Sequence, residues 1–226
     1  MAAPDQTVKF DNHGGIVLSD ANDIYRQIAL TLGDQGWCVT ENFLSPLLIA
    51  QLRHETKQLW RKGRFRHAGV GRGDSFEINP RLRTDHVLWL DSANVSGAQQ
   101  KYFDTVEQLR LAINRELFLG LLQFEAHIAL YPKGSFYKKH LDQFRGIGDR
   151  TVSVILYLNK DWRQEHGGQL RLYTDHRNPE FYIDILPQGG TLVSFLSARY
   201  LHEVLPANRP RKSITGWFSR RDAGRL

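Results

Sequence analysis

The chain has 226 residues, 41% hydrophobic and 24% charged, which fits one soluble globular domain and leaves little length for a second. It contains no apolar run of about 18 residues that could cross a membrane, no secretory signal at its N-terminus, and a single cysteine, so no internal disulfide can form and we expect a cytoplasmic protein. The formal net charge of +6 is dispersed among acids, which disfavours nucleic acid as the partner and leaves an acidic protein partner open.

The first 123 residues predict mainly helices. Ser19 or Asp20 can cap a first helix, and Ser45 followed by Pro46 is a typical start for a second, because the serine accepts a backbone N–H and proline lacks the N–H that would stay unpaired there. Apolar side chains recur at helical spacing in three segments. The expected helices cover residues 20–32, 46–62 and 99–119, and a short strand covers 37–43.

The segment between the second and third helices, residues 63–83, is rich in glycine and arginine. Gly69 and Gly71 begin a nucleotide-binding pattern that would need a further glycine in place of Asp74 and a surrounding βαβ unit. Neither is found in the sequence. We therefore expect a surface loop whose arginines help to grip a substrate.

From residue 124 to 221 the hydrophobic pattern takes the two-residue period of strands, interrupted by Gly, Pro, Asn and Asp turns. Strands that follow one another without intervening helices are typical of antiparallel sandwiches and jelly rolls. We expect a mainly β (α+β) fold, with a jelly-roll core buttressed by the N-terminal helices in a single domain over 1–226. The expected strands are FEAHIALY, SFYKKHLD, TVSVILYLN, GQLRLYT, FYIDILP, GTLVSFLS and KSITGWFS.

The expected strand SFYKKHLD carries His140 and Asp142, whose side chains at positions i and i+2 share one face of a strand. His202, which lies 60 residues beyond Asp142 (202 − 142) in RYLHEVLP, could complete a set of two histidines and a carboxylate. This set holds iron(II) and leaves open coordination positions. Some catalytic zinc sites use the same donors, but typically as H-E-x-x-H on a helix, which this sequence lacks.

Arg211 begins the expected strand RKSITGWFS and shares a face with Ser213, Thr215 and Trp217. An arginine inside a barrel is unfavourable unless an anion meets it, and a dicarboxylate could bind the metal at one end and Arg211 at the other. Tyr157, on the less apolar face of TVSVILYLN, could bond to the same carboxylate. Taken singly, each residue has an ordinary explanation in a core, a loop or a surface ion pair. Taken together, the order of His140, Asp142, Tyr157, His202 and Arg211 along the chain favours a metal site with a bound co-substrate.

The stretches LYPKGSFYKKHLD, VILYLNKDW, GGQLRLY and LHEVLPANRPRKSITGW, with RTDHVLWLD upstream, carry a family resemblance. From about residue 124 to 221 the chain resembles the catalytic domain of the prolyl-4-hydroxylase branch of 2-oxoglutarate oxygenases, especially the animal oxygen-sensing prolyl hydroxylases and their bacterial relatives known from pseudomonads. The resemblance implies a double-stranded β-helix fold. The collagen-modifying branch carries lysine at the position of Arg211, so this chain is more similar to the sensor branch.

The resemblance also implies roles for individual residues. The iron(II) ligands would be His140, Asp142 and His202. The residues that bind or border 2-oxoglutarate would be Tyr131, Tyr157, Arg211, Thr215 and Trp217. The substrate contacts would be Tyr137, Arg145 and Trp217. At His127 the animal relatives carry an apolar residue, and no role is implied for it.

By the same resemblance, the reaction is 4-hydroxylation of a prolyl residue with iron(II), 2-oxoglutarate and dioxygen, supported by ascorbate. The bacterial relatives imply elongation factor Tu as the protein substrate. The loop QFRGIGDR differs from the animal proteins, so their transcription-factor substrate does not carry over. Two alternatives remain open: an oxygenase acting on nucleic acid or another protein, and a metal-binding interaction module without turnover.

Overall fold

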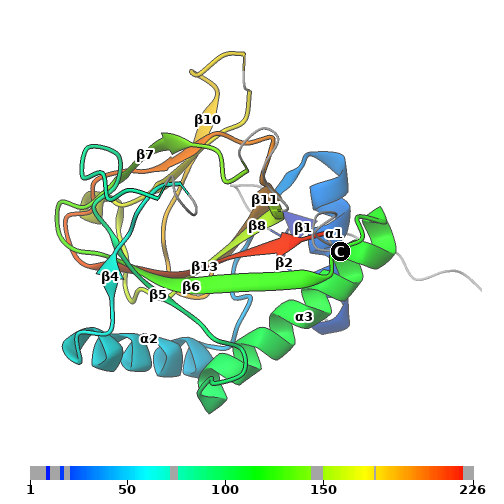
Figure 1. Cartoon of the computed structure of the whole chain (residues 1–226). Helices are drawn as coiled ribbons and strands as arrows, with labels where there is room; N and C mark the ends of the chain where they lie inside the picture. The colour runs from blue at the N-terminus through cyan, green and yellow to red at the C-terminus, as the bar shows by residue number, and fades with distance from the viewer. Residues whose placement is uncertain are drawn as a thin grey trace, which may run out of the picture.

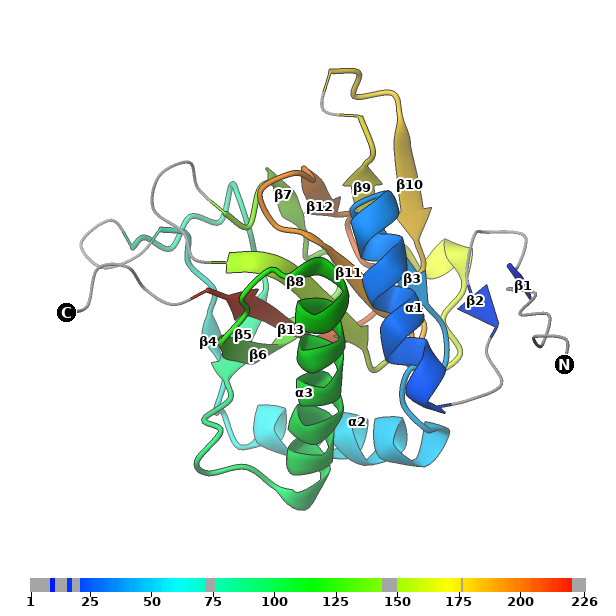
Figure 2. The ribbon, with the colours of Figure 1, turned by 90° about the vertical axis from the view of Figure 1, so that its right-hand side faces the viewer.

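The computed structural model describes residues 9–10, 16–17, 21–71, 76–143, 150–175 and 177–220. Two antiparallel sheets face each other, and three helices cover the outer face of the larger sheet (Figures 1 and 2). None of the helices in these ranges is long and apolar enough to cross a membrane. The expected N-cap residues Ser19 and Asp20, the position Asp74 in the glycine-rich segment, and the expected substrate contact Arg145 lie outside the described residues.

The strands form two main sheets in which every pair of neighbouring strands runs antiparallel. The large sheet has the order β3 (Trp37–Thr40), β11 (Leu192–Leu196), β8 (Arg150–Tyr157), β13 (Arg211–Ser219), β6 (Gln123–Tyr131), β5 (His86–Trp89) and β4 (Arg66–His67). The small sheet has the order β10 (Tyr182–Ile185), β9 (Leu170–Tyr173), β12 (His202–Val204) and β7 (Tyr137–His140). A separate pair joins β1 (Lys9–Phe10) and β2 (Ile16–Val17), and the 3-10 helix η2 covers Gln164–His166.

The three helices are α1 (Ala21–Asp34), α2 (Pro46–Arg61) and α3 (Gly97–Leu117). The predicted start of α2 is confirmed: the Ser45 side chain accepts a hydrogen bond from the backbone N–H of Leu48, and Pro46 occupies the first turn. Helix α3 begins two residues earlier than expected, because Ser96 forms a capping box with Gln99. These caps pair backbone N–H groups that helix geometry leaves without partners.

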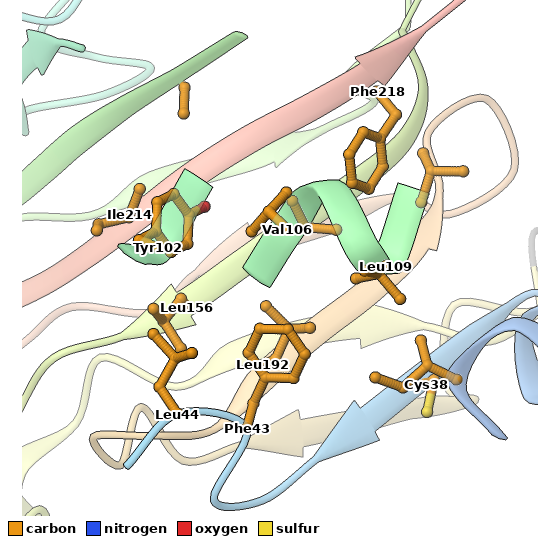
Figure 3. Packing of buried hydrophobic residues seen from close by; sticks show 14 of the residues in the cluster. Cys38, Phe43, Leu44, Tyr102, Val106, Leu109, Leu156, Leu192, Ile214 and Phe218 are labelled. Carbon is orange, nitrogen blue, oxygen red and sulfur yellow. The ribbon is translucent and has the colours of Figure 1, made fainter. Parts of the chain in front are cut away.

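The large sheet separates two apolar clusters because strand side chains alternate between its faces. On the outer face, Val106 and Leu109 of α3 pack in one cluster with Leu156, Ile214 and Phe218 of the sheet (Figure 3). Side chains on the inner face point between the sheets, and there the cluster includes several polar-tipped tyrosines. The predicted faces of β8 and β13 are confirmed, so Arg211 lies on the inner side and Ile214 on the outer side.

Five observed strands, β1, β2, β4, β5 and β12, were not among the expected ones, and one expected strand ends early. The strand that carries His140 ends at that residue, so Asp142 does not lie within a strand as expected. The pairing with the partner strand β12 stops at the pair His202 and His140, and the preceding residue Leu201 instead accepts a backbone hydrogen bond from Tyr173. Strand β12 itself was not expected, because its three residues are too few to show a two-residue period.

Candidate active site

The side chains of His140, Asp142 and His202 converge at one end of the small sheet. The Nε2 atom of His140 lies 3.6 Å from Oδ1 of Asp142, and the Nε2 atom of His202 lies 3.7 Å from Oδ2. One ligand atom from each of the three residues lies within 4.8 Å of the others. The register that places His202 opposite His140 therefore brings together the three residues that the sequence predicted as metal ligands.

Backbone carbonyls orient both imidazole rings. Nδ1 of His140 lies 2.7 Å from the carbonyl oxygen of Lys138, and Nδ1 of His202 lies 3.1 Å from that of Tyr200. A carbonyl can only accept, so each Nδ1 carries the proton and each Nε2 presents a lone pair toward Asp142. Burial lowers the pKa of His202 to about 4, assisted by the nearby His140, so this ring is neutral at neutral pH.

Two serines support the carboxylate. Ser153 of β8 donates a hydrogen bond of 2.6 Å to Oδ2 of Asp142, and its oxygen lies 2.8 Å from the hydroxyl of Ser197. Since the Ser153 proton is directed to Asp142, Ser197 is the donor in the second bond. Burial alone would raise the pKa of Asp142, but the positive charge that His202 carries at acid pH, the nearby His140 and the bond from Ser153 outweigh it and hold the pKa below its usual range. Asp142 is therefore an anion at neutral pH.

Replacing Ser153 by alanine should weaken iron(II) binding by about 10- to 100-fold, because an outer partner that orients a ligand is lost while the ligand remains. Titration against a competing chromogenic chelator measures this affinity. The matched control is Ser194→Ala on β11, a buried serine whose hydroxyl has no hydrogen-bond partner. Equal affinities in the two variants would mean that Ser153 does not position Asp142.

Arg211 supplies a buried positive charge in the same cavity. Its side chain is 1% exposed, its Nε donates 2.9 Å to the carbonyl oxygen of Gly168, and Nη1 lies 3.4 Å from the Ser213 hydroxyl. None of the described carboxylates lies within ion-pair distance of it. A buried guanidinium with spare donors and no counter-ion fits an incoming carboxylate.

Two tyrosines flank the Arg211 guanidinium. Its carbon lies 4.9 Å from the centre of the Tyr131 ring and 5.0 Å from that of Tyr157. The Tyr157 hydroxyl is buried without a hydrogen-bond partner, and burial raises its pKa to about 12 although Arg211 acts in the opposite direction. The hydroxyl is therefore a protonated donor that an added carboxylate could satisfy.

A cavity of about 690 Å³ joins the metal ligands to Arg211. Apolar residues of both sheets, among them Ile155, Leu170 and Val204, form part of its wall and limit the access of water. The sequence-predicted residues that line this cavity are Tyr131, Tyr137, His140, Asp142, His202, Arg211, Thr215 and Trp217. The observed donor set, a pair of oriented imidazoles and one carboxylate with a carboxylate-binding arginine in the same cavity, fits iron(II) with a dicarboxylate co-substrate.

Several residues at the site were not identified from the sequence. Arg83 forms a bidentate ion pair with Asp85, at 2.8 and 2.6 Å, and lies 4.1 Å above the ring of Tyr137. The other face of Tyr137 is stacked with His140, with ring centres 3.5 Å apart. Arg83 and Asp85 lie two residues apart in RTD, and in an extended segment such side chains point to the same side. This spacing could have predicted the ion pair.

Aromatic and charged side chains form the mouth of the cavity. Trp89 and Phe76 are 51% and 55% exposed, and Arg150 lies 3.5 Å above the ring of Trp217 while pairing with Glu125 at 2.7 Å. His127 contacts both Trp89 and Trp217, with ring centres 5.0 and 5.3 Å away, and the two indoles also contact each other at 6.1 Å. Burial lowers the pKa of His127 to about 3, so this histidine is a neutral wall residue at neutral pH.

Comparisons with known proteins agree with this geometry. Residues 126–219 match the 2OG-Fe(II) oxygenase superfamily. The chain is 40% identical to a prolyl-4-hydroxylase of Pseudomonas putida, with a TM-score of 0.78 over 88% of this chain and 100% of that one. A prolyl hydroxylase of Trichoplax adhaerens, solved with a peptide of the hypoxia inducible factor oxygen degradation domain, is 28% identical, with a TM-score of 0.78 over 88% of this chain and 90% of that one.

A curated relative extends the likeness to animals. The hypoxia-inducible factor prolyl hydroxylase of Caenorhabditis elegans is 30% identical over 209 residues, which cover 86% of this chain. The match covers only 28% of the length of that relative. The two proteins therefore share a region about as long as this chain, and most of the larger relative lies outside the match.

Proposed function

The chain belongs to the 2-oxoglutarate and iron(II) oxygenase superfamily, and we propose that it is a prolyl 4-hydroxylase that acts on another protein. The observation that carries the proposal is the single cavity in which the His140–Asp142–His202 cluster and the buried, anion-free Arg211 lie together. Members of this superfamily use iron(II), 2-oxoglutarate and dioxygen. A buried arginine of this kind is not needed by a module that only binds a metal.

The residues of the cavity would have two roles, metal binding and co-substrate binding. His140, Asp142 and His202 would hold iron(II) on one side, which leaves the other side open to the cavity. When bound, the metal with its co-substrate and dioxygen supplies the oxidation of a C–H bond coupled to the conversion of 2-oxoglutarate to succinate and CO₂. Arg211 and Tyr157 would bind the far carboxylate of 2-oxoglutarate, and so fix its orientation before any reaction begins.

The walls of the cavity exclude water and position the substrate. Tyr137 lies beside the metal ligands and is held between Arg83 and His140, which cover both faces of its ring, so its edge and hydroxyl would be the parts that meet a prolyl substrate. Trp217 lines the same cavity from β13 of the large sheet, and its indole N–H is buried without a partner. The exposed Trp89 and Phe76 offer an apolar surface to residues that flank the proline. A polypeptide substrate suits a cavity whose mouth carries such exposed aromatic side chains.

Elongation factor Tu is the substrate that we propose to test first, because the resemblance to bacterial relatives implies it. Such a substrate would place the protein in the cytoplasm. The test incubates elongation factor Tu with the protein, iron(II), ascorbate and 2-oxoglutarate, followed by mass spectrometry of its peptides beside a His202→Ala control. We expect one added oxygen atom on a single prolyl residue, absent in the control. Consumption of 2-oxoglutarate without that oxygen would retain the oxygenase and redirect the search to another protein or to nucleic acid.

A further inference from the structure

A second cavity, of about 580 Å³, lies on the opposite face of the large sheet from the metal site. Leu130 of β6 and Lys212 of β13 pair across the sheet and line this cavity. Their neighbours Tyr131 and Arg211, which also pair, line the metal cavity. Because side chains alternate along a strand, the two cavities lie on opposite faces of the same strands. We call the second cavity the α2 groove, since helix α2 forms its other wall (α2 and β6 in Figure 1).

The charged side chains of the α2 groove all have the same sign. Arg53 and Lys57 of α2 and Lys212 of β13 line it, and its lining contains no aspartate or glutamate. None of these three cations forms an ion pair with a described residue. Burial lowers the pKa of Lys212, and the nearby charges of Arg209, Arg53 and Lys57 lower it further. Like charges that converge without a counter-ion are unfavourable in the free protein, and an anion would relieve this repulsion.

The floor of the groove is apolar, which favours an anion that also carries an apolar group. Leu130, Pro132 and Pro210 line it, together with Trp60, which is 37% exposed. A lone inorganic anion would leave this floor uncovered, since it has no apolar surface to place there. A nucleic-acid backbone needs a basic strip that follows successive phosphates, whereas the three lining cations surround a single hollow. A ligand that carries carboxylates next to an apolar side chain matches both the three cations and the apolar floor of the groove.

We propose that the α2 groove binds an acidic peptide segment of a partner protein. Its carboxylates would lie against Arg53, Lys57 and Lys212, and an apolar side chain would cover Trp60 and the exposed Pro210. The site is separate from the hydroxylation chemistry, because none of these residues lines the metal cavity. A protein held there would contact the enzyme at a distance from the prolyl residue that the active site takes.

The test uses fluorescence anisotropy with a fluorescein-labelled peptide in which glutamate alternates with leucine, beside a peptide with glutamine in place of each glutamate. We expect the acidic peptide to bind at low salt and the glutamine peptide to bind at least about tenfold more weakly. Lys57→Glu should weaken binding of the acidic peptide by about tenfold or more. The matched control, Lys101→Glu, makes the same change at an exposed position of α3 outside the groove and should change the affinity by less than about twofold.

Three results would overturn the proposal. Equal losses in Lys57→Glu and Lys101→Glu would mean that only the overall charge matters. Unchanged affinity in both Lys57→Glu and Lys212→Glu would mean that the peptide binds elsewhere or not at all, and thermal melting of each variant shows whether it is folded. A single-stranded oligonucleotide that displaces the peptide and depends on Lys57 would identify a site for nucleic acid instead. Uncoupled turnover of 2-oxoglutarate by Lys57→Glu should equal that of the unsubstituted protein, which keeps this test independent of the proposed reaction.

Discussion

Replacing Asp142 by alanine should lower the affinity for iron(II) by more than about 100-fold and remove turnover of 2-oxoglutarate with it. Loss of an outer residue that only orients a ligand costs about 10- to 100-fold in metal affinity, and Asp142 is itself a predicted ligand. It is also the only carboxylate in the described cluster, so its loss removes the negative charge that a divalent cation requires. The two imidazoles would remain, held by their backbone carbonyls.

The measurement is a chelator competition under nitrogen, with 2-oxoglutarate turnover measured in parallel. Asp184→Ala is the matched control, since Asp184 pairs with Arg171 at the sheet surface and lies outside the cavity. We expect the control to bind iron(II) as the unsubstituted protein does. Strong binding that persists in Asp142→Ala would mean that the metal is held elsewhere, and the proposed function would lose the observation on which it rests.

Local signals in the sequence predicted the elements whose formation depends on neighbouring residues. Ser45 and Pro46 start α2 because a cap acts within one turn. The faces of β13 were predicted because alternation is a property of a single strand, and this placed Arg211 inside the barrel. The spacing of His140 and Asp142 predicted two side chains close together, and the structure has them so, although the strand that carries His140 ends sooner than expected.

Features that depend on distant parts of the chain could not be predicted in this way. Ser153 shares a face with Tyr157 in the sequence pattern, but nothing local shows that its hydroxyl meets Asp142, eleven positions earlier. The α2 groove combines Lys57 with Lys212, two residues that are brought together only by the packing of a helix on a sheet. Lys212 lies far from the two cations of α2 along the sequence, and only the fold brings it to them. The dispersed net charge argued against nucleic acid and left an acidic protein partner open, which is the class of partner that we propose for the α2 groove.

Replacing Arg211 by alanine should weaken 2-oxoglutarate binding by about 10- to 150-fold, or about 1.5–3 kcal/mol, the usual contribution of a hydrogen bond to a charged group. The guanidinium is fully buried, so solvent does not screen its attraction for a carboxylate. The guanidinium donates hydrogen bonds to neutral groups, the carbonyl of Gly168 and the hydroxyl of Ser213, and none of the described carboxylates pairs with it. Its removal therefore takes away a poorly compensated charge, and we do not expect the variant to lose its fold.

Thermal stability separates the binding role of Arg211 from a structural one. With iron(II) present under nitrogen, 2-oxoglutarate at 100 times its dissociation constant should stabilise the unsubstituted protein by about 2.7 kcal/mol. If the substitution raises that constant about 100-fold, the same concentration only equals the new constant, and the gain falls to RT ln 2, about 0.4 kcal/mol. Arg209→Ala, an exposed change two positions away, should keep the full gain. If the Arg211→Ala protein melts normally and still gains the full stabilisation from 2-oxoglutarate, Arg211 does not bind the co-substrate. The burial of this arginine without a carboxylate partner would then need another explanation.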